Sequence, residues 1–223
     1  MRIKLIFSSS DYIFNERFNK DVNGLVNKLL GNGNKYHGSF SRYSVSDFQG
    51  AVWGENGFSF PNGGFFFISS DDADFMTSII GGIMKSGADL YIKNMKYKGM
   101  DVCDFEVGKV FDVVRAISPI LITDGKKLVT FRDKEFVGLL TEKSRKKLLR
   151  CGLDEKKANS LTLELFHVEN ANTISVKIGE AINIGSRVMM IVKGDKDARK
   201  LIYEIGFGKC TGFGFGAVSV NNI

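Results

Sequence analysis

The sequence predicts an α+β protein built from two domains of similar element order. The chain has 223 residues, which is enough for one large domain or for two of about 110 residues. Apolar residues make up 43% of the chain, enough for a packed core. In the first half, segments with strand and helix periodicity follow one another as strand, helix, strand, strand, helix, strand. This order is the split βαβ arrangement of a ferredoxin-like domain.

Each element of the first half has its own local signal. Residues 2–7 alternate in polarity and precede a run of serines, which predicts a strand. Residues 18–30 have apolar side chains at helical spacing, and the glycines and asparagines at 31–34 end that helix. Residues 43–48 and 63–68 predict two strands.

The first half closes with a helix and a strand region. Asp71 and Asp72 begin the helix, because carboxylates are favoured in the first turn of a helix. Apolar residues from Phe75 to Met84 line one face of it, and Gly87 ends it. Residues 90–107 predict one or two strands.

The second half repeats the order in a decorated form. Residues 113–123 predict a strand that Ser118-Pro119 interrupts, and Asp124-Gly125 predicts a tight turn before a strand at 128–131. The remaining elements are a helix at 135–151, strands at 161–168 and 173–178, one or two strands at 181–192, a helix at 195–205 and a strand at 217–220. We place the N-terminal domain at residues 1–108 and the C-terminal domain at 109–223.

The charge is concentrated in the second half. Residues 1–108 carry 11 basic and 12 acidic side chains, whereas residues 109–223 carry 20 basic and 13 acidic ones, which together give the net charge of +6. A basic domain beside a neutral one suggests a polyanionic partner, although ordinary solvation by lysine is an equal alternative.

Several classes of protein are disfavoured. No apolar run approaches the roughly 18 residues of a membrane helix, and the apolar N-terminus is too short for a signal peptide. The 3 cysteines are far apart and offer neither a disulfide framework nor a CxxC metal site. We therefore expect a cytoplasmic protein with no metal and no membrane partner.

The segment from Gly206 to Gly216 is rich in glycine, with 5 glycines in 11 residues. Glycines allow positive φ and close backbone approach, so successive N–H groups can form a nest for phosphate. The order here is helix, loop, strand, whereas dinucleotide and P-loop sites need strand, loop, helix. The structural alternative is a helix cap and a glycine-relaxed strand edge. Lys209 and the interspersed phenylalanines suit RNA with unstacked bases.

This segment, GFGKCTGFGFGAV, resembles the glycine-rich loop of the RAMP superfamily of CRISPR-associated proteins. It is most similar to the loop of the Cas6 endoribonucleases, which cut CRISPR precursor RNA. Residues 36–46, YHGSFSRYSVS, resemble the histidine segment of that family, and Ser118–Ile122 resembles its Ser-Pro strand. The helix at 195–205 that runs into the loop has the same order. The resemblance implies two tandem ferredoxin-like domains.

The resemblance implies a catalytic role for His37. The ribose 2′-OH of RNA is its own nucleophile, so a histidine can take the proton without a metal or a cofactor. Attack on the adjacent phosphate leaves a 2′,3′-cyclic phosphate and a 5′-OH end. Arg42 is the candidate cation for the transition state, where the family often has lysine, and Lys35 is an alternative. Tyr36 and Tyr43 are candidates to orient the phosphate or the 2′-OH.

The expected partner is CRISPR repeat RNA in the precursor crRNA. Candidate RNA contacts are the loop residues Gly206, Gly208, Lys209, Gly212 and Gly214, the basic helix residues Lys143, Arg145, Lys146, Lys147 and Arg150, and Lys196, Arg199, Lys200 and Lys35. A solvated helix face is the alternative interpretation of the basic helix. Two other functions stay open, a non-catalytic RAMP subunit that binds RNA in an effector complex and a protein-binding or metabolite-binding module. The resemblance is also compatible with a homodimer.

Overall fold

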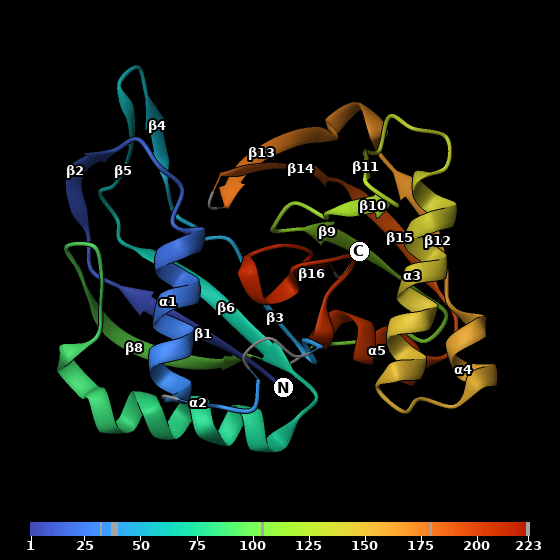
Figure 1. Cartoon of the computed structure of the whole chain (residues 1–223), viewed down its shortest axis with the longest axis horizontal. Helices are drawn as coiled ribbons and strands as arrows, with labels where there is room; N and C mark the ends of the chain where they lie inside the picture. Colours follow the sequence, from blue (N-terminus) through green and yellow to red (C-terminus); the bar gives the residue numbers. More distant parts are fainter. Residues whose placement is uncertain (32, 37–39, 104, 179, 222–223) are drawn as a thin grey trace.

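The computed structural model describes residues 1–31, 33–36, 40–103, 105–178 and 180–221, so His37 lies outside the described residues. Two antiparallel sheets, one from each half of the chain, lie side by side (Figure 1). The first has the order β3 (Tyr43–Val45), β6 (Gly64–Ser70), β1 (Arg2–Phe7), β8 (Met95–Cys103), β7 (Tyr91–Ile92). The second has the order β12 (Thr162–Phe166), β15 (Met189–Lys193), β9 (Phe111–Ala116), β16 (Val218–Asn221).

The two sheets share one topology. In the first sheet β1 lies between β6 and β8, and in the second sheet β9 lies between β15 and β16. This is the strand order of a ferredoxin-like βαββαβ unit. The predicted fold class of two tandem ferredoxin-like units is confirmed. The predicted boundary between residues 108 and 109 falls in the connection from β8 to β9 and stays a prediction.

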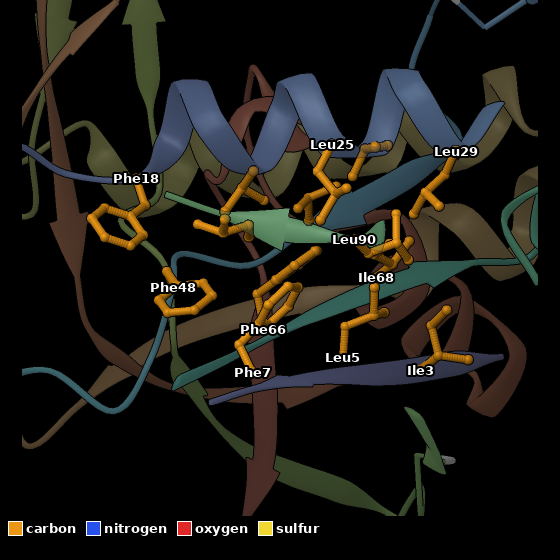
Figure 2. Close-up of a cluster of buried hydrophobic side chains, with 14 of the residues drawn as sticks. Ile3, Leu5, Phe7, Phe18, Leu25, Leu29, Phe48, Phe66, Ile68 and Leu90 are labelled. Atoms are coloured by element: carbon orange, nitrogen blue, oxygen red, sulfur yellow. The ribbon is translucent and has the colours of Figure 1, made fainter. Parts of the chain in front are cut away.

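The core of the first half lies between its sheet and two helices, α1 (Asn19–Leu30) and α2 (Ala73–Ser86). Figure 2 shows Ile3, Leu5 and Phe7 of β1 on the same side of the strand, facing the helix side chains. All three are buried, because alternate residues of a strand share a face. The Asp72 side chain accepts a hydrogen bond from the Phe75 N–H at 3.0 Å, so the predicted carboxylate start of α2 is confirmed.

The second half has a core of its own. The helices α3 (Phe136–Arg150), α4 (Glu155–Ser160) and α5 (Lys196–Ile205) flank its sheet (Figure 1). Phe136, Leu140 and Leu148 of α3 are fully buried. Two hairpins complete this half, β10 (Ile122–Asp124) with β11 (Lys127–Val129) and β13 (Asn172–Ile178) with β14 (Ala181–Arg187). The first has a two-residue turn at Gly125 and Lys126, so the tight turn predicted from Asp124-Gly125 is present.

Several elements differ from the predictions. The predicted strand at 113–123 is two strands, because β9 ends at Ala116 before Pro119, which has no N–H for a ladder. Sequence periodicity missed α4 and a three-stranded sheet of β2 (Ser10–Phe14), β5 (Gly57–Phe60) and β4 (Val52–Gly54). These strands are short and lie among polar and glycine-rich residues, which conceals a period of two. None of the helices in the described ranges is long and apolar enough to cross a membrane.

The glycine-rich loop, residues 206–216, packs between the two halves (Figure 1). From the first half, Asn19 Nδ2 donates to the Phe213 carbonyl at 3.1 Å, and Asn23 Nδ2 donates to the Gly212 carbonyl at 3.1 Å. From the loop, the Thr211 hydroxyl donates to the Tyr43 carbonyl of the first half at 2.8 Å. The loop therefore fastens the second half to α1 and β3.

The predicted phosphate nest is wrong for most of this loop. Gly206, Gly212 and Gly214 are buried. The N–H groups of Gly206, Phe207, Lys209, Phe213 and Gly216 donate to backbone carbonyls within the protein. A Cβ on Gly214 would lie 2.4 Å from Asn19 Nδ2, so glycine is needed there for close packing. The structural alternative accounts for these glycines. Among the predicted loop contacts, Gly208 is half-buried and Lys209 is exposed.

Replacing Gly216 by alanine is expected to destabilise the protein by about 1–3 kcal/mol or more. Gly216 has φ +66°, and its Cβ would lie 1.8 Å from the Phe207 carbonyl oxygen. The measurement is the free energy of unfolding in urea. As the control, Gly138→Ala lies on α3 with no atom near its Cβ, so it should raise that free energy by roughly 0.5–1 kcal/mol. Equal stabilities of the two variants would contradict this account.

Candidate nucleic-acid interface

A cleft of about 360 Å³ lies where the two halves meet. One wall is the basic face of α3, a second is the surface part of the glycine-rich loop, and the third is the segment after the histidine. The lining residues are Phe40, Ser41, Lys143, Lys146, Lys147, Arg150, Gly208, Lys209, Cys210 and Thr211. The cleft thus brings together three regions that are separate in the sequence.

Helix geometry places the basic residues of α3 together. Positions 143, 146 and 150 are three or four residues apart and share one face of the helix. Lys146 pairs with Glu142 on the same helix, whereas Lys143 and Arg150 form no ion pair with any described acidic side chain. Lys209, across the cleft, donates to the Thr123 hydroxyl and is likewise without a described carboxylate partner. The cleft therefore carries uncompensated positive charge.

Two described residues of the histidine segment border this cleft. His37 lies outside the described residues, but Phe40 and Ser41, a few residues later, line the cleft. The Tyr36 ring packs edge-on against Phe75, with 5.0 Å between the ring centroids. Lys35 is exposed, and its ammonium lies 3.6 Å from the Asp74 carboxylate. Lys35 is outside the lining of the cleft.

Arg42 forms an ion pair with Asp71, which precedes α2. A hydrogen bond to Asp71 raises the pKa of the Arg42 guanidinium. The Ser70 hydroxyl also donates to the Arg42 carbonyl at 2.6 Å, which holds this backbone beside β6. A phosphate would have to compete with Asp71 for the guanidinium of Arg42.

The structure contradicts two predicted functional residues. Tyr43 is only 7% exposed and stacks on Phe75 at 4.3 Å between ring centroids, so it cannot orient a phosphate. Arg199 is fully buried, and its guanidinium lies 2.6 Å from the carboxylate of Asp112. Its predicted contact with RNA is wrong, because the α5 face that carries it packs against the start of β9.

Two basic residues of α3 also have structural roles. Lys147 is buried, and its ammonium donates to the carbonyls of Ile205 at 2.7 Å and Gly206 at 3.0 Å. It joins α3 to the start of the glycine-rich loop, so its ammonium is already bonded within the protein. Lys147 still lines the cleft, and its predicted RNA contact stays a prediction. The Arg145 guanidinium donates to the Leu161 carbonyl at 2.9 Å and lies outside the cleft.

The remaining candidates divide by position. Lys196 and Lys200 are exposed near the start of α5 and do not line the cleft. Phe40, Ser41, Cys210 and Thr211 line it but were not predicted. Each lies within four residues of a predicted site residue, which is the one sequence feature that could have indicated it. Closeness in the sequence does not tell which neighbouring side chains face the cleft. No three described His, Cys, Asp or Glu side chains gather as a metal-binding group.

Comparisons with known proteins agree with this architecture. No curated protein sequence matches the chain. The family described as CRISPR associated protein Cas6, C-terminal, matches residues 104–220, which is more than half of the chain. The chain belongs to this Cas6 family.

Solved structures with low sequence identity share the Cas6 fold. A Cas6-related protein from Pyrococcus furiosus has a TM-score of 0.82 at 19% identity, over 100% of this chain and 98% of that one. A RAMP protein binding different RNA substrates has a TM-score of 0.81 at 21% identity, over 100% of both chains. A Cas6 product complex has a TM-score of 0.67 at 12% identity, over 99% of both. The family match spans α3 and the glycine-rich loop, which form two walls of the cleft.

The buried Lys147 of this Cas6 protein is expected to make stability depend on pH. Burial lowers the pKa of Lys147 from 10.5 to about 7. Between these values the unfolded chain binds a proton that the folded chain does not, so stability rises with pH from about 7 to 10.5. The burial cost is fully present below pH 7. Relative to Lys147→Met, the wild type should gain stability at up to about 1.4 kcal/mol per pH unit.

Urea unfolding of both proteins between pH 6.5 and 9.5 measures this difference. Groups that titrate equally in the two proteins cancel in the subtraction. A difference that is flat with pH, or that favours Lys147→Met more as pH rises, would contradict the expectation.

Proposed function

We propose that this Cas6-family protein is an endoribonuclease that binds CRISPR repeat RNA and cleaves precursor crRNA. Family membership supports a general role in CRISPR repeat RNA processing. The observation that carries the proposal is the convergence of the segment after His37, the basic face of α3 and Lys209 on one cleft. A basic cleft of this kind suits the phosphates of an RNA strand.

The proposed reaction needs only groups of the protein and the RNA. His37 takes the proton of the ribose 2′-OH, whose oxygen forms a bond to the adjacent phosphorus. The bond from phosphorus to the 5′-oxygen breaks, and that oxygen takes up a proton. The products are a 2′,3′-cyclic phosphate and a 5′-OH end. Lys143 and Lys209 would stabilise the more anionic transition state.

The test is incubation of the full-length protein with labelled repeat RNA from the CRISPR array of its source organism, in EDTA. We expect one cut whose 5′ product ends in a cyclic phosphate, identified by mass spectrometry. Cleavage that EDTA abolishes, or a product with a 3′-OH end, would contradict the proposed chemistry.

A second candidate function is that of a non-catalytic RAMP subunit that binds RNA in an effector complex. The Arg42–Asp71 ion pair favours it, because Asp71 already binds the guanidinium that was predicted to stabilise the transition state. The similar RAMP protein that binds different RNA substrates has the same fold. Tight RNA binding without cleavage in the assay above would support this function, and no binding would favour a protein-binding module. The predicted homodimer is tested separately, by measuring the molecular mass of the protein in solution.

A further inference from the structure

We propose that Phe40 and Arg150 form a stacking platform for one unpaired nucleobase of the bound RNA. This inference rests on the proposed function and names the kind of substrate the cleft takes. It predicts that the nucleotide beside the reacting phosphate is single-stranded when bound.

The two residues come from opposite walls of the cleft and touch. The guanidinium carbon of Arg150 lies 4.2 Å from the centroid of the Phe40 ring. Arg150 is the last residue of α3, and Phe40 comes from the segment after the histidine. The contact therefore exists only when the two halves are docked as they are here.

The surroundings of Phe40 are those of a binding residue. Phe40 is half-buried and, within the described residues, belongs to neither of the two large hydrophobic cores. It lines the cleft together with Lys143 and Lys209. The chain after it is held by the Arg42–Asp71 pair and by the Ser70 hydrogen bond to the Arg42 carbonyl. A ring in this position is anchored by its backbone and open to a ligand.

Arg150 provides a planar group on top of this ring. It is exposed, and no described carboxylate neutralises it. A guanidinium is weakly hydrated and stacks on flat π-systems, and RNA-binding proteins use both aromatic rings and guanidinium planes to hold unstacked bases. A base added to this stack would place its ribose and phosphates near the cleft lysines.

Base pairing would prevent this contact, because a paired base is stacked within its own helix. Base stacking on a protein ring is worth about 1–3 kcal/mol, or roughly 5- to 150-fold in affinity. The cleft should therefore distinguish a nucleotide that carries a base from an abasic one.

The experiment is an abasic scan of the repeat RNA in EDTA, with a 2′-deoxyribose at the mapped cut position to prevent cleavage. Dissociation constants are measured for the wild type, Phe40→Leu and Arg150→Lys. Leucine keeps apolar volume without a ring, and lysine keeps the charge without a plane. In the wild type, loss of one base near the cut should weaken binding about tenfold or more. Both variants should bind intact and abasic RNA equally.

The matched control is Lys143→Gln, because Lys143 lines the same cleft and contacts no aromatic ring among the described residues. It should weaken binding of intact and abasic RNA by the same factor. The slope of log binding constant against log salt concentration should become shallower by about 0.7, the contribution of one phosphate contact on a single strand. Circular dichroism confirms that each variant is folded.

The outcomes separate this inference from the proposed function. If the wild type cleaves intact RNA but binds every abasic RNA as tightly as the intact one, the inference alone is overturned. The same holds if loss of the base still weakens binding in both Phe40→Leu and Arg150→Lys. Failure of the wild type to bind intact repeat RNA overturns both.

Discussion

Replacement of Asp112 by alanine is expected to lower the free energy of unfolding by about 3–5 kcal/mol, because it leaves a buried charge without its partner. Arg199 is fully buried, and its guanidinium lies 2.6 Å from the Asp112 carboxylate. The same carboxylate accepts hydrogen bonds from the Tyr203 hydroxyl at 2.8 Å and the Gly108 N–H at 2.6 Å. Alanine would remove the acceptor for all three donors. Urea unfolding measures the loss.

The double variant Asp112→Leu with Arg199→Met tests whether the unpaired charge is the cause. Replacing both members of a buried pair with apolar residues is often nearly neutral. This variant should therefore recover the part of the stability that the unpaired charge costs, while the Tyr203 hydroxyl and the Gly108 N–H still lack their acceptor. Glu164→Ala breaks an exposed pair with Lys193 and should change stability little. A single Asp112→Ala variant as stable as Glu164→Ala would contradict this account.

Replacement of His37 by alanine is expected to slow cleavage of repeat RNA by roughly 10²–10⁴-fold, the usual contribution of a general acid or base. Binding should change little, because the cationic side chains that hold the phosphates are on α3 and at Lys209. Single-turnover rates at saturating protein, with dissociation constants measured separately, distinguish the two effects.

His167 offers the matched control for this experiment. It is the second of the 2 histidines, it is exposed, and its Nδ1 lies 2.8 Å from the Glu169 carboxylate. His167→Ala should cleave at the wild-type rate. Undiminished cleavage by His37→Ala would remove His37 as the base and leave the mechanism without its central residue.

Local sequence signals predicted the elements that local physics determines. The alternation in β1, the apolar face of α1 and the carboxylate cap of α2 each depend on residues a few positions apart, and each is present in the structure. The short strands β2, β4 and β5 escaped prediction. β2 pairs with the distant β5, for example Phe14 with Phe58, so no local period reveals that pairing. β4 and β5 form a local hairpin, but these strands of three and four residues are too short to show a clear period of two.

The candidate site was predicted only in part, because charge can be counted in a sequence and exposure cannot. Lys143 and Lys147 are both on the basic face of α3 and both line the cleft, yet Lys143 is half-buried whereas Lys147 is buried with its ammonium bonded to the loop carbonyls. The helix period gives the same expectation for both. The difference comes from α5 and the loop, which pack on one edge of that face.

The glycine-rich loop shows the same division. The sequence by itself determined that residues 206–216 form a backbone with little room for side chains, since glycine at 5 of 11 positions permits positive φ and close backbone approach. Only the tertiary structure decided what that backbone approaches. The glycines at 206, 212 and 214 make room for Ser44, Tyr43 and Asn19 of the first half. Close packing between distant segments depends on the docked surfaces of both, which no stretch of the chain specifies alone.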